Sequence, residues 1–199
     1  MTNTNSMTSR PTRRPPGIPH TIALLLLLCA ANASAQDDPF ARRAWTLQLA
    51  GHGAFEAWNY NISREEMWGI VPGFTYGVGR GVAVTAAWPM YYVAQRGPNV
   101  WMFGATIGVR GRFYRRGRVA AFWELDVGVS KAETHTPPRG TRFNYLAFGG
   151  AGATVRLRPG THMLAGLRWI HVSNNGLAGR DRNPDIEAIG PQMGILISF

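Results

Sequence analysis

The chain has little cysteine, little charge and no helical periodicity. Its 199 residues include a single cysteine, which excludes a disulfide scaffold and a cysteine-rich metal site. Charged residues make up 16% of the sequence, well below the roughly one quarter found in ordinary soluble domains. No segment keeps an apolar period of 3.6 residues, so a coiled coil is excluded as well. The length leaves room for one domain.

The amino terminus has the three parts of an export signal. Its basic region contains Arg10, Arg13 and Arg14. Residues 22–28 form an apolar run that is too short to cross a hydrocarbon core of about 30 Å. The small residues 33–35 provide a signal-peptidase site, which predicts cleavage after Ala35. We therefore expect a signal peptide over residues 1–35 and a mature domain over residues 36–199 that contains no cysteine.

The chain is basic, with a formal net charge of +10 that falls to +7 without the three signal-peptide arginines. The charge of an exported basic protein is better matched to lipid head groups than to nucleic acid. No set of His, Asp and Glu has convincing metal-ligand spacing, and His52 and His162 are expected as an interior and a turn residue. No metal or other cofactor is predicted.

The mature sequence is dominated by a period of two, which predicts β-strands. Each run is long compared with the about 5–6 residues of a typical strand. The eight runs are residues 45–58, 67–79, 81–94, 101–114, 118–131, 142–158, 161–173 and 187–199.

Within these runs one face is apolar and the other is small, glycine-rich or charged. In the fourth run, for example, Trp101, Phe103 and Ile107 share a face opposite Gly104 and Arg110. The charged set has both signs and can fill a narrow interior with ion pairs, while the apolar set faces lipid. The expected interior charges are Glu124, Asp126, Arg110, Arg112, Arg156 and Arg168. The expected interfacial girdle is Trp45, Trp68, Trp88, Tyr91, Tyr92, Trp101, Trp123 and Trp169. The pattern predicts an all-β, eight-stranded antiparallel transmembrane β-barrel of the outer-membrane type.

The connections and the carboxy terminus agree with this fold. Three tight turns alternate with four longer connections near residues 59–66, 95–100, 132–141 and 174–186, as expected for short periplasmic turns and longer outer loops. Residues 192–199, which end in Phe199, resemble the carboxy-terminal assembly signal of outer-membrane barrels.

Three polar residues lie where the alternation predicts the lipid face. His171 and Ser173 continue the outward face of the seventh run, and Glu187 begins that of the eighth. Polar groups are costly in this position, although at a strand end they can simply meet water. Antiparallel pairing brings the two strand ends together, so a nucleophile, a base and an orienting acid could lie within reach of one another.

The segment 166–199 resembles the lipid A 3-O-deacylase family (the PagL type, grouped as acyloxyacyl hydrolases). The resemblance rests on a His-x-Ser-Asn stretch, then a short loop with Asn, and then Glu. It implies an eight-stranded barrel in the Gram-negative outer membrane, with a serine esterase site on the outside facing the outer leaflet. The roles it implies are Ser173 as nucleophile, His171 as general base, Glu187 as orienting acid, Asn183 as an oxyanion-hole donor, and backbone N–H groups near Asn175 and Gly176 as a second donor.

The resemblance also implies lipid A of lipopolysaccharide as the substrate, within outer-membrane lipid. Outer-loop cations could hold its phosphates or could equally be solvated loop charges: Arg96, Lys131, Arg139, Arg142, Arg180 and Arg182.

Several alternatives stay open at the sequence level. The loop before Glu187 is longer than the family pattern, since residues 180–182 look inserted, and Asp185 is a rival to Glu187 as the triad acid. Acyl-chain preference, activity on phospholipid and homodimerisation are also undetermined. The competing function is that of a non-enzymatic small barrel acting in adhesion or membrane stability.

Overall fold

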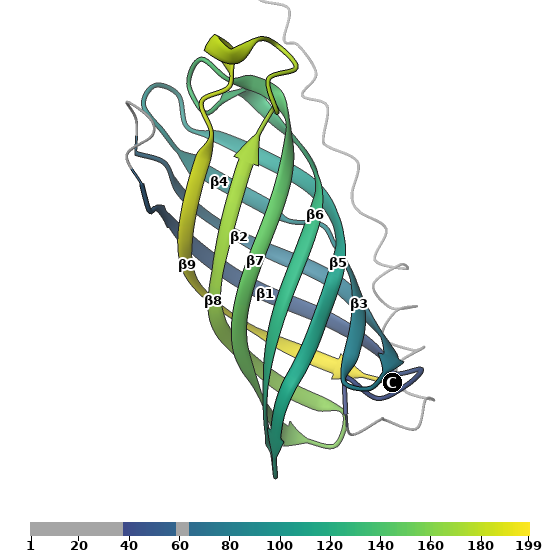
Figure 1. Cartoon of the computed structure of the whole chain (residues 1–199). Helices are drawn as coiled ribbons and strands as arrows, with labels where there is room; N and C mark the ends of the chain where they lie inside the picture. The colour runs from purple at the N-terminus through teal and green to yellow at the C-terminus, as the bar shows by residue number, and fades with distance from the viewer. Residues whose placement is uncertain (1–37, 59–63) are drawn as a thin grey trace, which may run out of the picture. The chain divides into compact units, whose positions relative to one another are not determined.

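A computed structural model describes residues 38–58 and 64–199, which form an antiparallel β-barrel (Figure 1). The strands are β1 (Trp45–Glu56), β2 (Glu66–Gly79), β3 (Val82–Ala87), β4 (Met90–Ala94), β5 (Val100–Arg116), β6 (Val119–Thr136), β7 (Thr141–Arg158), β8 (Thr161–Ser173) and β9 (Ile186–Ser198). A 3-10 turn, η1 (Arg180–Arg182), lies between β8 and β9. Among the described residues no helix is long and apolar enough to cross a membrane. The predicted signal peptide, residues 1–35, lies outside the described residues.

The sheet closes because β1 pairs with both β2 and β9. β3 and β4 together occupy one position between β2 and β5, so the ring has the eight strand positions that the sequence predicts. The third predicted run is split at Trp88 and Pro89, because proline has no N–H to donate to the ladder. Its carbonyl still accepts from the Gly104 N–H at 2.8 Å, which keeps the two halves in line.

The two ends of the barrel differ. One end, here called the turn end, carries the tight connections after β2, β5 and β7 together with the carboxy terminus (Figure 1). The opposite end, the loop end, carries the longer connections, including residues 174–185 between β8 and β9. Short turns on the periplasmic side and longer outer loops are typical of outer-membrane barrels.

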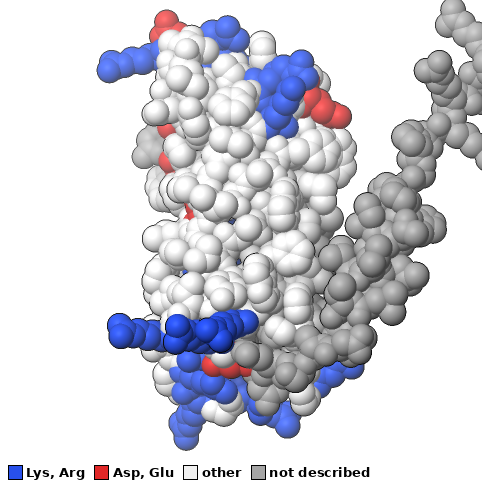
Figure 2. Space-filling view, turned by 90° about the vertical axis from the view of Figure 1, so that its right-hand side faces the viewer, with Lys and Arg blue, Asp and Glu red and all other residues white. Residues whose placement is uncertain are grey.

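The alternation of faces follows the prediction. Ile107 is 67% exposed on the wall, whereas Arg110, three residues further along β5, is 3% exposed. Figure 2 shows a broad band with almost no charge between two charged ends, which is the surface expected against hydrocarbon. One girdle assignment was wrong: Tyr91 points into the barrel, where its hydroxyl is 2.8 Å from His52 Nδ1. Tyr91 precedes Tyr92, and only one of two consecutive strand residues can face outward.

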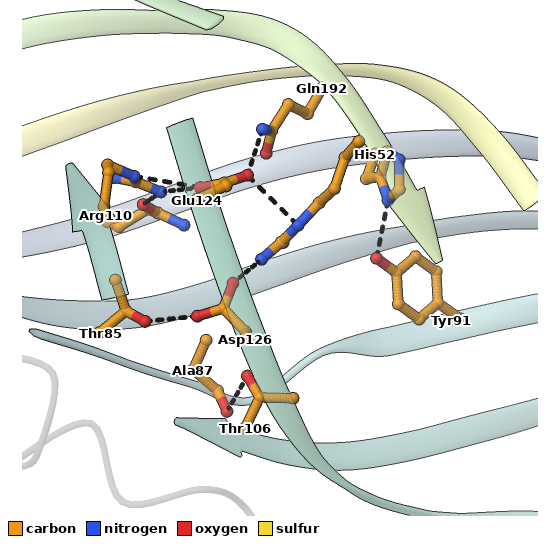
Figure 3. A network of polar contacts seen from close by, with 11 residues as sticks. His52, Thr85, Ala87, Tyr91, Thr106, Arg110, Glu124, Asp126 and Gln192 are labelled. Carbon is orange, nitrogen blue, oxygen red and sulfur yellow. Dashed lines mark hydrogen bonds and ion pairs between the residues drawn. The ribbon is translucent and has the colours of Figure 1, made fainter. Parts of the chain in front are cut away.

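The interior is filled by a network of ion pairs and hydrogen bonds (Figure 3). Glu124 on β6 accepts from Arg110 Nη2 at 2.6 Å and from Gln192 Nε2 at 2.5 Å. Asp126 pairs with Arg168 Nη2 at 2.5 Å and accepts from the Thr85 hydroxyl. These buried charges oppose one another, as the mixed signs of the inward face predict. The other two predicted interior residues, Arg112 and Arg156, are half-buried near the turn end, where the Arg112 guanidinium lies over the Phe40 ring.

The segment before β1 packs into the turn end. Phe40 is 2% exposed and joins Phe122 and Leu164 in a cluster inside the barrel. Asp38 pairs with Arg112 at 2.5 Å and Arg115 at 2.7 Å. Burial raises the pKa of Asp38, but the hydrogen bonds and positive charge, led by Arg112, outweigh burial and hold it below its ordinary value.

Candidate active site on the outer wall

The strand register brings two of the three candidate residues side by side. His171 on β8 and Glu187 on β9 are direct register partners, and Ser173 follows His171 by two residues at the end of β8. Ile170 and Val172 are fully buried inside the barrel, so alternation directs His171 and Ser173 toward the outer wall. The side chains of His171 and Glu187 are 28% and 18% exposed.

Glu187 is held by two donors. Its Oε1 lies 2.7 Å from His171 Nδ1, and its Oε2 accepts from the Trp169 indole N–H at 2.6 Å. The Trp169 ring also stacks against the imidazole, with centroids 5.9 Å apart and planes at 21°. Because Nδ1 faces the carboxylate, Nε2 is the nitrogen left to accept a proton. The sequence predicts Trp169 as a residue of the interfacial girdle first and of an acyl-chain groove second, although its position two residues before His171 on the same face was a usable signal for a place in the site.

Ser173 is more enclosed than its partners, at 5% exposure. Its hydroxyl donates to Asn183 Oδ1 at 3.0 Å, and its oxygen accepts from the Asn175 N–H at 3.0 Å. The hydroxyl is therefore directed to the loop, and among the described residues it makes no hydrogen bond with His171. Residues two apart in a strand are about 7 Å apart along the chain, so a change in the Ser173 rotamer is needed to join them.

The loop over Ser173 is braced by Asn174, which sequence reasoning missed as a site residue. Its Oδ1 accepts from the Gly176 N–H at 2.9 Å, and its Nδ2 donates to the Arg182 carbonyl at 2.5 Å. Its own N–H donates to Asn183 Oδ1 at 2.9 Å. The predicted oxyanion groups are thus gathered here, but Asn183 presents its amide oxygen to Ser173, and the Gly176 N–H is bound by Asn174.

Asp185 lies close to the histidine and glutamate. One ligand atom from each of His171, Asp185 and Glu187 lies within 4.8 Å of the others, so these three residues could hold a metal ion. Sequence spacing did not reveal this set, because Asp185 belongs to the loop and the other two to neighbouring strands. The same proximity keeps Asp185 within reach of the imidazole as a second acid.

The predicted phosphate-binding cations fall into two groups. Arg180 and Arg182 form η1 in the same loop as Asn183. The other four lie on or beside the β4–β5 and β6–β7 connections: Arg96, Lys131, Arg139 and Arg142. Arg96 and Arg142 line a separate hollow of about 420 Å³ together with Glu133 and His135. The structure therefore places only Arg180 and Arg182 in the loop that covers Ser173.

Several solved outer-membrane barrels share the fold of this chain. The crystal structure of the outer membrane enzyme PagL is 17% identical, with 75% of this chain and 97% of that chain covered and a TM-score of 0.52. Neisserial surface protein A is 12% identical, with coverage of 78% and 99% and a TM-score of 0.57. OprG from Pseudomonas aeruginosa is 10% identical, with coverage of 82% and 99% and a TM-score of 0.51.

These structural similarities establish the fold alone, and no curated protein matches the chain. The profile of the family described as lipid A 3-O-deacylase (PagL) matches residues 31–195, which is most of the sequence. The chain therefore belongs to the lipid A 3-O-deacylase (PagL) family, hydrolases of the Gram-negative outer membrane that act on lipid A.

Proposed function

We propose that this protein removes the 3-O-linked hydroxyacyl chain of lipid A with a Ser-His-Glu triad on the outer wall of the barrel, facing the outer leaflet. The observation that carries the proposal is the hydrogen bond between His171 and Glu187 on the outside of the barrel. His171 precedes Ser173 by two residues on β8. A base already oriented by a carboxylate beside a hydroxyl is the arrangement that activates a serine nucleophile.

The chemistry requires one local rearrangement. Rotation of Ser173 about χ1 moves its hydroxyl from Asn183 toward His171 Nε2, which takes the proton as Oγ attacks the ester carbonyl. The tetrahedral intermediate collapses when the imidazolium returns this proton to the leaving sugar oxygen, which leaves the acyl chain on Ser173. Water, deprotonated by His171, then releases the hydroxy fatty acid and restores the serine.

The oxyanion is stabilised by donors of the covering loop. The Asn175 N–H already lies 3.0 Å from Ser173 Oγ. When Ser173 leaves Asn183, a half-turn of the Asn183 amide presents Nδ2 to the site and frees the Asn174 N–H as another donor. Each such donor contributes about 3–4 kcal/mol to transition-state stabilisation in other hydrolases.

The wall below the site suits an acyl substrate. Tyr145, the register partner of Ser173 on β7, is exposed, as are Leu167 on β8 and Ile189 on β9. An acyl chain can lie along this apolar surface while the ester reaches Ser173 at the loop end. A lipid in the leaflet can thereby bring its ester to Ser173 without passing through the barrel.

Trp169 acts here as a positioning residue. Its indole N–H donates a hydrogen bond to Glu187 Oε2, which leaves Oε1 as the carboxylate oxygen that binds His171. The stacked indole also restricts rotation of the imidazole. Both effects keep Nε2 directed toward the wall, where the substrate ester would lie.

The test is the mass of lipid A extracted from a Gram-negative host that expresses the full chain. Wild-type protein is expected to remove one hydroxyacyl chain, whereas Ser173→Ala and His171→Asn leave lipid A intact while retaining heat-modifiable migration on gels. Ser130→Ala, at a serine buried inside the barrel, is the matched control and keeps activity. Unchanged lipid A with folded wild-type protein, or full activity of Ser173→Ala, would refute the proposal. Parallel assays on phospholipid vesicles determine whether the acyl esters of phospholipids are also cleaved.

A further inference from the structure

The positive charge of this protein is concentrated at the turn end of the barrel. One acidic residue of the described chain, Asp38, lies among the basic residues there. The nine basic residues of this end, named here the arginine ring, are Arg42, Arg43, Arg80, Arg112, Arg115, Arg116, Arg118, Arg156 and Arg158.

The rest of the described barrel is close to neutral. Inside the wall, the two arginines of the interior network are matched by Glu124 and Asp126. At the loop end, seven basic residues are balanced by seven acidic ones. The basic set is Arg64, Arg96, Lys131, Arg139, Arg142, Arg180 and Arg182, and the acidic set is Glu56, Glu65, Glu66, Glu133, Asp181, Asp185 and Glu187. On the face in Figure 2, the upper end mixes both signs, whereas the lower end is almost entirely basic.

The arginine ring extends around the circumference. Its members come from the segment before β1 and from the turns after β2, β5 and β7, which are spread around the closed sheet. A protein partner that docks against one side of the barrel would require the positive charge to be gathered on that side. Positive charge contributed by four separate connections instead matches a layer of negative charge that surrounds the barrel, which is the geometry of a membrane leaflet.

Part of the arginine ring is available to a ligand. Arg112 and Arg115 are engaged by Asp38, but Arg80, Arg116 and Arg118 are exposed and make no ion pair with any described residue. All nine members are arginine, whose planar guanidinium binds phosphate oxygens through two parallel hydrogen bonds.

Apolar wall lies immediately beside these arginines. Val78 precedes the β2–β3 turn, and Phe113, which is 66% exposed, precedes the β5–β6 turn. Arginine stems can lie on such a surface while the guanidinium groups reach the polar layer. The arginine ring is therefore positioned at the hydrocarbon boundary of the leaflet that the turn end meets.

We propose that the arginine ring binds the phosphate groups of anionic phospholipids in the periplasmic leaflet. Head-group phosphates there surround the barrel on all sides, and their charge complements an end that otherwise carries an uncompensated excess of guanidinium groups. This contact fixes the depth of the turn end in its leaflet, independently of the chemistry at the loop end.

The test measures retained lipid by native mass spectrometry of the folded full-length mature chain in detergent with equal amounts of phosphatidylglycerol and phosphatidylcholine. Wild-type protein is expected to retain phosphatidylglycerol preferentially, and less of it at high salt, because salt screens charges beyond about 10 Å. The triple variant Arg80→Gln, Arg116→Gln and Arg118→Gln should lose roughly tenfold or more of this preference. The matched control Arg64→Gln, Arg96→Gln and Arg139→Gln changes the same charge at the loop end and should retain it. Arg80 and Arg139 both have a left-handed backbone, with φ of 56° and 71°, so the test variant and the control variant each replace one residue in this conformation.

Heat-modifiable migration verifies that each variant is folded, and Arg118→Gln alone with a salt titration replaces any triple variant that is not. Inorganic phosphate at the lipid concentration should not displace phosphatidylglycerol. Equal retention of the two lipids by wild-type protein would overturn the proposal, as would equal loss in the two triple variants. Displacement of phosphatidylglycerol by inorganic phosphate would also overturn it, because the arginine ring would then bind free phosphate as well as it binds the lipid.

Discussion

Two polar clusters of this barrel use similar residue types on opposite sides of the same wall. In the interior cluster, Glu124 and Asp126 each meet an arginine and further donors, and all these side chains are buried. In the outer cluster, the Glu187 carboxylate is hydrogen-bonded to an imidazole and an indole, and the nearby hydroxyl of Ser173 is bound by a loop amide.

The difference shows how the face of a strand determines the task of a carboxylate. An interior carboxylate compensates buried positive charge, so its removal should destabilise folding. A carboxylate on the outer wall stabilises little, because it is partly exposed and has no full counter-charge. Its removal should instead affect the orientation of the base. The following predictions test this contrast between a structural and a functional cluster.

The largest effect is expected from Glu187→Gln, which leaves His171 without its anionic partner. By analogy with triad acids in other hydrolases, kcat should fall by about 10³–10⁴ without loss of folding. Initial rates of hydroxy fatty acid release from lipid A measure this effect. The control is Asp185→Asn, for which a loss below about threefold is expected. A larger loss in Asp185→Asn than in Glu187→Gln would transfer the role of triad acid to Asp185.

Inside the barrel, Glu124→Gln should act on stability instead. Arg110 and Arg168 would both lose a buried counter-charge, and breaking such a pair costs about 3–5 kcal/mol. The midpoint of urea unfolding, followed by heat-modifiable migration, should decrease, while activity per folded molecule stays unchanged. The exposed Glu66→Gln makes the same chemical change and should shift stability by less than about 0.5 kcal/mol. Equal midpoints for the two variants would contradict a structural role of the interior network.

Trp169→Phe should have a smaller effect, confined to the outer cluster. It removes the indole N–H that holds Glu187 but keeps an aromatic ring beside His171. A hydrogen bond to a charged group contributes about 1.5–3 kcal/mol, so kcat should fall by about tenfold or somewhat more, with KM unchanged. Trp101→Phe, another exposed tryptophan near the loop end, is the control and keeps kcat. A change in KM alone would assign Trp169 to substrate binding.

The smallest effect is expected at the turn end, from Asp38→Asn. Since the pKa of Asp38 is lowered in the folded barrel, its ionised form stabilises folding above the unfolded pKa, and this contribution disappears as pH falls through the folded value. At pH 7 the variant should be about 1 kcal/mol less stable than wild type. In urea unfolding measured across the pH range, the difference should begin to shrink as pH falls below about 4 and should disappear below the folded pKa of Asp38. A difference that stays the same from pH 7 down to the lowest pH at which both barrels remain folded would show that charge is not the cause.

Much of the fold could be predicted from the period of two alone. Alternation marked the lipid face at Ile107 and the interior at Arg110, and the structure keeps both. It did not reveal the break at Pro89 or the entry of Phe40 into the barrel, because these depend on packing against distant strands. Tyr91 was predicted in the girdle because it is aromatic, but the alternation that turns Tyr92 outward turns Tyr91 into the barrel.

For the candidate site, the sequence by itself determined that His171, Ser173 and Glu187 share the outward face, since side-chain direction along a strand is a local property. Only the tertiary structure decided that His171 and Glu187 are register partners and that Trp169 joins them, because register is set by closure of the whole sheet. The folded loop likewise decided that Asn174 and Asn183 enclose Ser173, since a connection with no repeating pattern has no contacts that spacing can predict.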